Sequence, residues 1–131
     1  MSVVLDSSVL VAALTDTGAD GIWAENILSS GSLHAPELIG AEVMNVLRRL
    51  ELAKLITTPE ANGAREDLMQ LDIALFPFEP FAERVWALRH NLTSYDAWYT
   101  AVAEGLKLPL ATLDGRLSRS PGISCDFLTP G

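Results

Sequence analysis

The chain opens with Ser2-Val-Val-Leu-Asp-Ser-Ser8, followed directly by the apolar run Val9–Leu14. The β-branched, apolar residues at the start favour a short buried strand. Asp and Ser are preferred caps of helix N-termini, so the apolar run behind them is expected to be a helix. This order of strand, turn and helix is typical of an α/β protein with a parallel sheet.

The same alternation continues along the next part of the chain. Gly21–Leu28 has apolar residues at helical spacing, and Gly31 ends this helix before a short strand at Leu33–Ala35. Pro36 suits the first position of the following helix. An apolar stripe at offsets 0, 4, 7, 8 and 11 predicts that this helix packs one face on the core. The stripe is Ile39, Val43, Val46, Leu47 and Leu50.

A further helix is expected to begin with Thr58 as its N-cap and Pro59 at its first position. It would lead toward a strand or turn at Phe76–Phe78. Three leucines mark its apolar face, Leu68, Leu71 and Leu75.

Two helices and two strands are expected in the last third of the chain. The first helix has apolar residues at offsets 0, 4, 7 and 11, namely Phe81, Val85, Leu88 and Leu92. Ser94 is expected to cap the second helix, with Gly105 near its end. Leu108–Thr112 and Ile123–Leu128 are predicted to be strands.

The predicted fold class is therefore α/β, with three α/β/α layers around a mostly parallel sheet of four to five strands. A length of 131 residues with 49% hydrophobic composition predicts one domain, residues 1–131, around one core. No charged and apolar leader precedes the first strand, and no apolar run is long enough to cross a membrane. We therefore expect a cytoplasmic protein without a membrane contact. The single Cys125 excludes an intramolecular disulfide and a Cys-based zinc site.

The formal net charge is −8 at pH 7. Such a surface offers no electrostatic footprint for direct binding of a polyanion. A nucleic-acid substrate would require a cation bound by the protein, and a basic protein partner would be attracted to the same surface.

Four acidic residues lie where the predicted strands and helices meet, Asp6, Glu42, Asp96 and Asp114. In parallel sheets, ligands bind beyond the carboxyl ends of the strands, where Asp6 and Asp114 are expected. Glu42 lies within or beside the apolar stripe, where a charge needs a partner. Four converging carboxylates would repel one another unless a cation lay between them.

Each acid also has an ordinary structural explanation. Asp6 would serve as an N-cap, Glu42 would pair with a nearby arginine, Asp96 would favour a helix N-terminus, and Asp114 would serve a turn. One position alone does not decide between these explanations. The set of four, in order along an α/β chain, favours a shared site.

Mg²⁺ and Mn²⁺ prefer carboxylate and water oxygens, and the scarcity of His and Cys argues against zinc or copper. A divalent cation can activate an attacking water and stabilise the charge that develops on phosphate. The four acids are therefore predicted to be both the metal ligands and the catalytic residues of a phosphodiester-cleaving site.

Four fragments occur in order along the chain: Val3-Val-Leu-Asp-Ser-Ser8, Glu42-Val-Met-Asn45, Ser94-Tyr-Asp-Ala-Trp-Tyr99 with Ala103-Glu104, and Leu110-Ala-Thr-Leu-Asp114. Together they resemble PIN-domain proteins, specifically the VapC ribonuclease toxins of bacterial toxin–antitoxin pairs. The resemblance covers nearly the whole chain and implies a PIN-like fold.

This resemblance implies that Asp6, Glu42, Asp96 and Asp114 bind Mg²⁺, for which Mn²⁺ can substitute. It also implies cleavage of structured RNA such as tRNA or ribosomal RNA, homodimerisation, and neutralisation by a cognate VapB-like antitoxin. Other residues at matching positions are candidates for hydrogen bonds to the acids (Ser7, Asn45 and Thr112) and for contact with substrate phosphate (Arg116).

Two other functions remain open at this point. One is a PIN-type DNA nuclease, although the chain has little room for insertions that would clasp a DNA junction. The other is a non-catalytic module whose acidic cleft receives a basic segment of a partner protein. It would bind that partner without depending on a metal.

Overall fold

The computed structural model describes the whole chain, Met1 to Gly131, as alternating strands and helices. The strands are β1 (Val3–Leu5), β2 (Leu33–Pro36), β3 (Ile73–Phe76), β4 (Leu110–Ala111) and β5 (Phe127–Leu128). The helices are α1 (Ser7–Thr15), α2 (Ala19–Leu28), α3 (Ile39–Leu52), α4 (Thr58–Gln70), α5 (Ala82–Ala87), α6 (Ser94–Leu106) and α7 (Gly115–Ser118), with a 3-10 turn, η1, at Glu79–Phe81.

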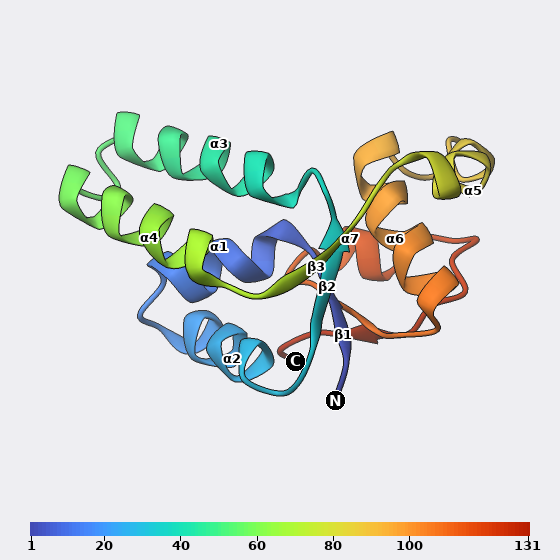
Figure 1. The fold of residues 1–131 in the computed structure, drawn as a ribbon, viewed down its shortest axis with the longest axis horizontal. Helices are drawn as coiled ribbons and strands as arrows, with labels where there is room; N and C mark the ends of the chain where they lie inside the picture. Colours follow the sequence, from blue (N-terminus) through green and yellow to red (C-terminus); the bar gives the residue numbers. More distant parts are fainter.

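The five strands form one sheet in the order β3-β2-β1-β4-β5, and every neighbouring pair is parallel. Helices α1 to α4 lie on one side of the sheet and α5 and α6 on the other (Figure 1). All three residues of β1 are completely buried, as expected for a central strand covered on both faces. The predicted three-layer α/β/α fold and its parallel sheet are thus confirmed.

The order of the strands creates a crevice beside β1. From β1 the chain builds outward through β2 to β3, and then returns to the other side of β1 with β4. Leu5 at the end of β1 is paired with Ala111 at the end of β4. Parallel sheets bind ligands where the strand order reverses in this way, so the residues after Leu5 and Ala111 occupy the favoured position.

Only part of the apolar stripe of α3 is buried in the core as predicted. Ile39, Val43 and Leu47 are buried, whereas Val46 and Leu50 remain partly exposed. The predicted start of this helix at Pro36 is wrong, because Pro36 is the last residue of β2, opposite Phe76 of β3. A proline is compatible with a strand end, where its missing N–H leaves no ladder bond unmade.

Two helix caps lie one residue before their predicted positions. Thr57 caps α4 through a capping box, because its hydroxyl accepts from the Glu60 N–H and the Glu60 carboxylate accepts from the Thr57 N–H. Thr93, and not Ser94, caps α6 by accepting from the Asp96 N–H. At each helix start, two neighbouring residues have side chains that suit an N-cap, Thr57 and Thr58 for α4, and Thr93 and Ser94 for α6. In each case the residue whose hydroxyl accepts from the N–H of the third helical residue is the earlier one.

The limits of four other elements also differ from the sequence-based predictions. Leu75 lies in β3 and is 52% exposed, since α4 already ends at Gln70. The helix predicted from Phe81 to Leu92 contains only six α-helical residues, although turns keep Leu88 and Leu92 buried. The two last strands are shorter than predicted, with two residues each.

The core consists of 26 buried hydrophobic residues from both helical layers and the sheet. Along α6, five consecutive residues from Tyr99 to Ala103 are buried, because this helix lies between the sheet and α5. Its buried position matters for the site described below, since Asp96 is in its first turn. No helix of the fold has the length and apolar composition needed to cross a membrane.

Candidate active site

Asp6 follows the last residue of β1 and is 6% exposed. Its side chain makes no capping bond to α1, although it occupies the N-cap position. Instead, Oδ2 accepts from the Ser8 hydroxyl at 2.7 Å and from the Thr112 hydroxyl at 2.8 Å. The simple N-cap explanation therefore does not account for Asp6, which is a buried carboxylate held by two hydroxyl groups.

Glu42 lies in the first turn of α3 and does not pair with an arginine. Its Oε1 accepts a hydrogen bond from the buried Tyr99 hydroxyl of α6. Burial raises the pKa of Glu42, the Tyr99 bond opposes this rise, and the negative charges of Asp6 and Asp96 add to it. The same environment raises the pKa of Tyr99, so this phenol remains a donor to Glu42.

Asp96 is partly buried in the first turn of α6. Burial raises its pKa, and the charges of Asp6 and Asp114 raise it further, while Thr93 and Arg116 lower it. A role in favouring the helix N-terminus would lower the pKa of a carboxyl group. The rise in the pKa of Asp96 instead follows from its burial, with the neighbouring negative charges adding to it.

Asp114 has the turn role that its sequence position suggested. It caps the short helix α7, with Oδ1 accepting from the N–H groups of Arg116 at 2.9 Å and Leu117 at 3.3 Å. Its own N–H donates to the Thr112 hydroxyl at 2.9 Å. The Thr112 hydroxyl therefore connects Asp114 to Asp6.

Three of the acids line one cavity of about 500 Å³, namely Asp6, Asp96 and Asp114. Glu42 does not line this cavity, but it is close enough to Asp6 and Asp96 for their charges to raise its pKa. The only ion pair in the structure, Arg84 with Glu104, is elsewhere, so no basic side chain neutralises the cluster by direct contact. This donor set suits a hard divalent cation, although no three of its side chains are arranged as a ready metal-binding group.

The other residues predicted for the site have different surroundings. Thr112 is completely buried and bonds to Asp6, and Ser7 lies against the Tyr99 hydroxyl. Arg116 is exposed and lines a second hollow with Asp96 and Asp114. Asn45 is exposed on α3 and makes no side-chain hydrogen bond, so the structure does not bring it to the acids.

Two residues that contact the acids escaped the sequence analysis. Ser8 donates to Asp6 and accepts from the Leu113 N–H, which connects the start of α1 to the loop after β4. Tyr99 contacts Glu42 across 57 residues of sequence. In the sequence, Ser8 suited a helix cap and gave no sign of a contact with an acid. For Tyr99 the one available signal was its position three residues after Asp96, which puts both on the same face of a helix.

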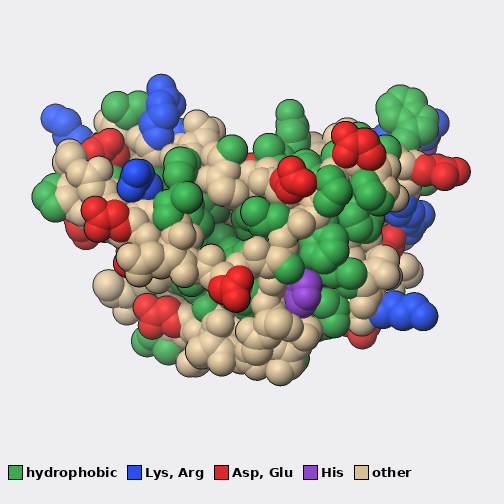
Figure 2. Space-filling view, viewed as in Figure 1, with side chains coloured by type: hydrophobic (Ala, Val, Ile, Leu, Met, Phe, Trp, Pro, Cys, Tyr) green, Lys and Arg blue, Asp and Glu red, His purple; other side chains and the backbone are tan.

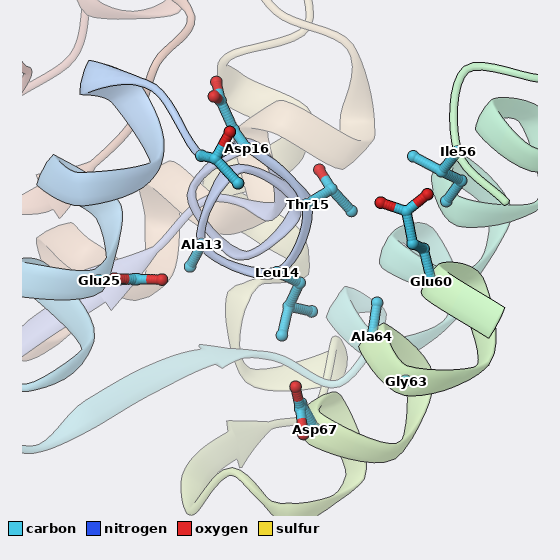
Figure 3. Close-up of a pocket in the computed structure, with 11 residues that line it drawn as sticks. Ala13, Leu14, Thr15, Asp16, Glu25, Ile56, Glu60, Gly63, Ala64 and Asp67 are labelled. Atoms are coloured by element: carbon cyan, nitrogen blue, oxygen red, sulfur yellow. The ribbon is translucent and has the colours of Figure 1, made fainter.

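Another hollow, of about 300 Å³, lies between α1, α2 and α4 and shares Thr15 and Asp16 with the cavity of the acids. Its walls combine apolar residues with four carboxylates, Asp16, Glu25, Glu60 and Asp67. In Figure 3, Leu14 and Thr15 of α1 face Glu60 and Ala64 of α4 across this hollow. Figure 2 shows acidic groups scattered over one whole face of the molecule, with basic groups mainly toward its two ends.

The PIN-domain family model matches residues 3–122. The chain is 40% identical to ribonuclease VapC1 of Mycobacterium tuberculosis over 95% of its own length and 94% of that protein. It is 33% identical to ribonuclease VapC9 of the same species over 94% of each chain. Both relatives therefore match from end to end.

Solved structures share the fold at low sequence identity. The crystal structure of M. tuberculosis VapC20, a toxin that cleaves the sarcin–ricin loop, has a TM-score of 0.67 at 17% identity and covers 93% of this chain and 96% of that one. VapBC2 of Rickettsia felis, bound to a promoter DNA fragment, has a TM-score of 0.65 at 14% identity with 98% of both chains covered. By its family match and its full-length relatives, the chain belongs to the PIN-domain family, within the VapC group.

Proposed function

We propose that this protein is a Mg²⁺-dependent endoribonuclease toxin that cleaves structured RNA, with tRNA and ribosomal RNA as the substrate classes. The observation that carries the proposal is the acidic cluster at the end of β1, where Asp6, Asp96 and Asp114 share one cavity without a basic partner. The ribonuclease names of relatives that match from end to end support the same activity.

The chain's own residues would have distinct tasks in this reaction. Asp6, Asp96 and Asp114 would hold Mg²⁺, or Mn²⁺ in its place, and Glu42 would complete the acidic set behind them. Bound Mg²⁺ supplies a positive charge for the phosphate and lowers the pKa of the attacking water. Ser8 and Thr112 fix the orientation of Asp6, and Tyr99 fixes that of Glu42. Arg116 would contact the substrate backbone from the exposed rim.

A VapB-like antitoxin is the proposed protein partner, and the toxin itself is proposed to be a homodimer. Structures of relatives include VapBC complexes from Rickettsia felis and M. tuberculosis. A net charge of −8 and the acidic hollow between α1, α2 and α4 suit a partner segment with basic side chains.

The test is incubation of the purified, antitoxin-free protein with total RNA, followed by mapping of new 5′ ends. Wild type in Mg²⁺ is expected to give discrete cuts, which EDTA or the Asp96→Asn substitution should abolish. The Asp20→Asn variant is a matched control, because Asp20 is an exposed acid in the first turn of α2.

The same assay addresses the competing functions. Cleavage of DNA substrates in preference to RNA would favour a DNA nuclease. Intact RNA with folded wild-type protein would favour a non-catalytic module, and antitoxin binding in EDTA as tight as in Mg²⁺ would agree with that alternative.

A further inference from the structure

Two hollows meet at the Asp96 and Asp114 carboxylates. The larger, of about 500 Å³, is lined by these acids, by Asp6 and Asp16, and by an apolar wall from α1, α3 and the loop after β4. The smaller, of about 320 Å³, is lined by Arg116 and by neutral polar residues that include Asn91 and Ser120. Asp96 and Asp114 thus line both hollows, whose other lining residues differ in charge and polarity.

The charges of the two hollows differ. None of the twelve residues that line the larger hollow is basic, whereas Arg116 lines the smaller one. A metal ion at the acids would attract the scissile phosphate, but no other group in the larger hollow attracts a phosphate, whereas the Arg116 guanidinium group does so in the smaller one. The backbone beyond the scissile phosphate is therefore favoured on the Arg116 side, and an uncharged part of the substrate is favoured on the other.

The apolar wall of the larger hollow consists of Val11, Ala12, Val46, Leu50 and Leu113. All of them except the buried Ala12 are partly exposed, although the helical spacing assigned Val46 and Leu50 to the core. Half-exposed apolar side chains along a cleft beside polar groups are typical of a ligand site. In an RNA strand, the component that is uncharged and offers a flat apolar face is the base.

We infer that the larger hollow is a nucleobase subsite, in which an unstacked base next to the scissile phosphate rests on Val46 and Leu50. This inference depends on the proposed ribonuclease function. The strand then crosses Asp96 and Asp114, and its next phosphate lies beside Arg116. A base within a duplex does not reach such a site without being extruded, so the substrate class narrows to RNA with an unpaired nucleotide at the cut.

The test combines a protein variant with a substrate variant. Leu50→Ala shortens the apolar wall, and Leu52→Ala is its matched control, because Leu52 is on the same helix, 65% exposed and outside both hollows. The substrate is an RNA hairpin that contains a mapped cut, either intact or with an abasic ribose on one side of the cut or the other. Cleavage rates of all combinations give a double-mutant cycle.

Leu50→Ala is expected to slow cleavage of the intact hairpin about tenfold, in the range for one lost apolar contact in a pocket. At one flanking position, base removal should slow the wild type and the Leu52→Ala variant by a similar factor, but should slow Leu50→Ala much less. Melting temperatures of the three proteins confirm that all are folded.

Equal penalties for base removal in wild type and Leu50→Ala, at both positions, would overturn the inference while leaving the ribonuclease function intact. Normal RNA cleavage by Leu50→Ala together with escape from antitoxin inhibition would also overturn it, because the wall would then serve a protein segment. Failure of the wild type to cut any RNA in Mg²⁺ would overturn both proposals.

Discussion

At the scale of single residues, Asp96 is held in a position that is unfavourable for its charge. Its raised pKa means that the folded protein binds the proton more tightly than the unfolded chain does. The resulting loss of stability is therefore present above the folded-state pKa and disappears as the pH falls below it. We expect Asp96→Asn to stabilise the metal-free protein at pH 7, by roughly 1 kcal/mol or less because solvent screens a partly exposed group.

Thermal melts in EDTA measure this effect, with Asp20→Asn as the control that removes an exposed acid from an equivalent helix turn. Mg²⁺ should then raise the melting temperature of the wild type more than that of Asp96→Asn, because binding to the folded state alone adds stability. A lower melting temperature for Asp96→Asn in EDTA would show that the charge of Asp96 does not destabilise the metal-free fold.

A substitution at Tyr99 tests whether metal binding requires the Glu42 carboxylate to be held in place. Tyr99→Phe removes only the hydroxyl that donates to Glu42, since the ring is already buried in the core. We expect a several-fold rise in the Mg²⁺ concentration needed for half-maximal cleavage, together with a loss of stability of about 1 kcal/mol, typical of one hydrogen bond. An unchanged Mg²⁺ dependence with the same loss of stability would restrict Tyr99 to a structural role.

At the scale of elements, the ion pair of Arg84 on α5 with Glu104 on α6 connects both helices to the C-terminal loop. The Glu104 carboxylate also accepts from the N–H and hydroxyl of Ser124, and Arg84 donates to the Gly122 carbonyl. Burial raises the pKa of Glu104, but the bonds from Arg84 and Ser124 outweigh this and lower it. A lowered carboxylate pKa stabilises the fold above the unfolded-state value, and this stability is lost as the pH falls through the folded-state value.

We therefore expect Glu104→Gln to destabilise the protein by about 1 to 2 kcal/mol at pH 7, allowing for the partial exposure of Arg84. The difference from wild type should shrink as the pH approaches 3. Chemical denaturation across this pH range measures it, with the exposed Glu83 of α5 as the matched Glu→Gln control. A difference that does not change with pH would mean that the charge of Glu104 contributes nothing to the effect.

The accuracy of the sequence-based predictions also varied between elements. Helix α3 was identified in type because its apolar residues recur over three turns, a strong local signal. Its start was wrong because Pro36 is compatible with both a first helical turn and the end of a strand. The very short strands β4 and β5 gain their structure from pairing with distant residues, as in Leu110 with Phe127, so their limits were not encoded locally.

At the scale of the whole molecule, the sequence predicted that Asp6 and Asp114 would meet, because the topology of a parallel sheet brings the ends of its strands together. It did not predict the bond between Tyr99 and Glu42, or the exposure of Val46 and Leu50 along the cleft. Those features depend on how α3 and α6 are positioned over the sheet. Helical periodicity shows which side chains share a face, but not where the neighbouring surface ends.

The charge of the whole molecule leads to a last prediction, about how salt affects the reaction. In nucleic-acid binding, the slope of log affinity against log salt counts the phosphates neutralised by basic groups, at about −0.7 per phosphate for single strands. The net charge is −8, and Arg116 is the only basic residue that lines either hollow of the site. We therefore expect kcat/KM for RNA, at fixed free Mg²⁺, to fall with NaCl with a shallow slope of about −1.

Arg116→Ala should lower kcat/KM at low salt and bring this slope close to zero, whereas Arg119→Ala, an exposed arginine outside both hollows, should leave it unchanged. Initial cleavage rates measured at NaCl concentrations from roughly 50 to 300 mM give both slopes. A wild-type slope steeper than about −4 would mean that RNA lies across a basic surface away from the acidic cleft. In that case Arg116 would be one of many phosphate contacts, and its removal would change the slope by less than about 1.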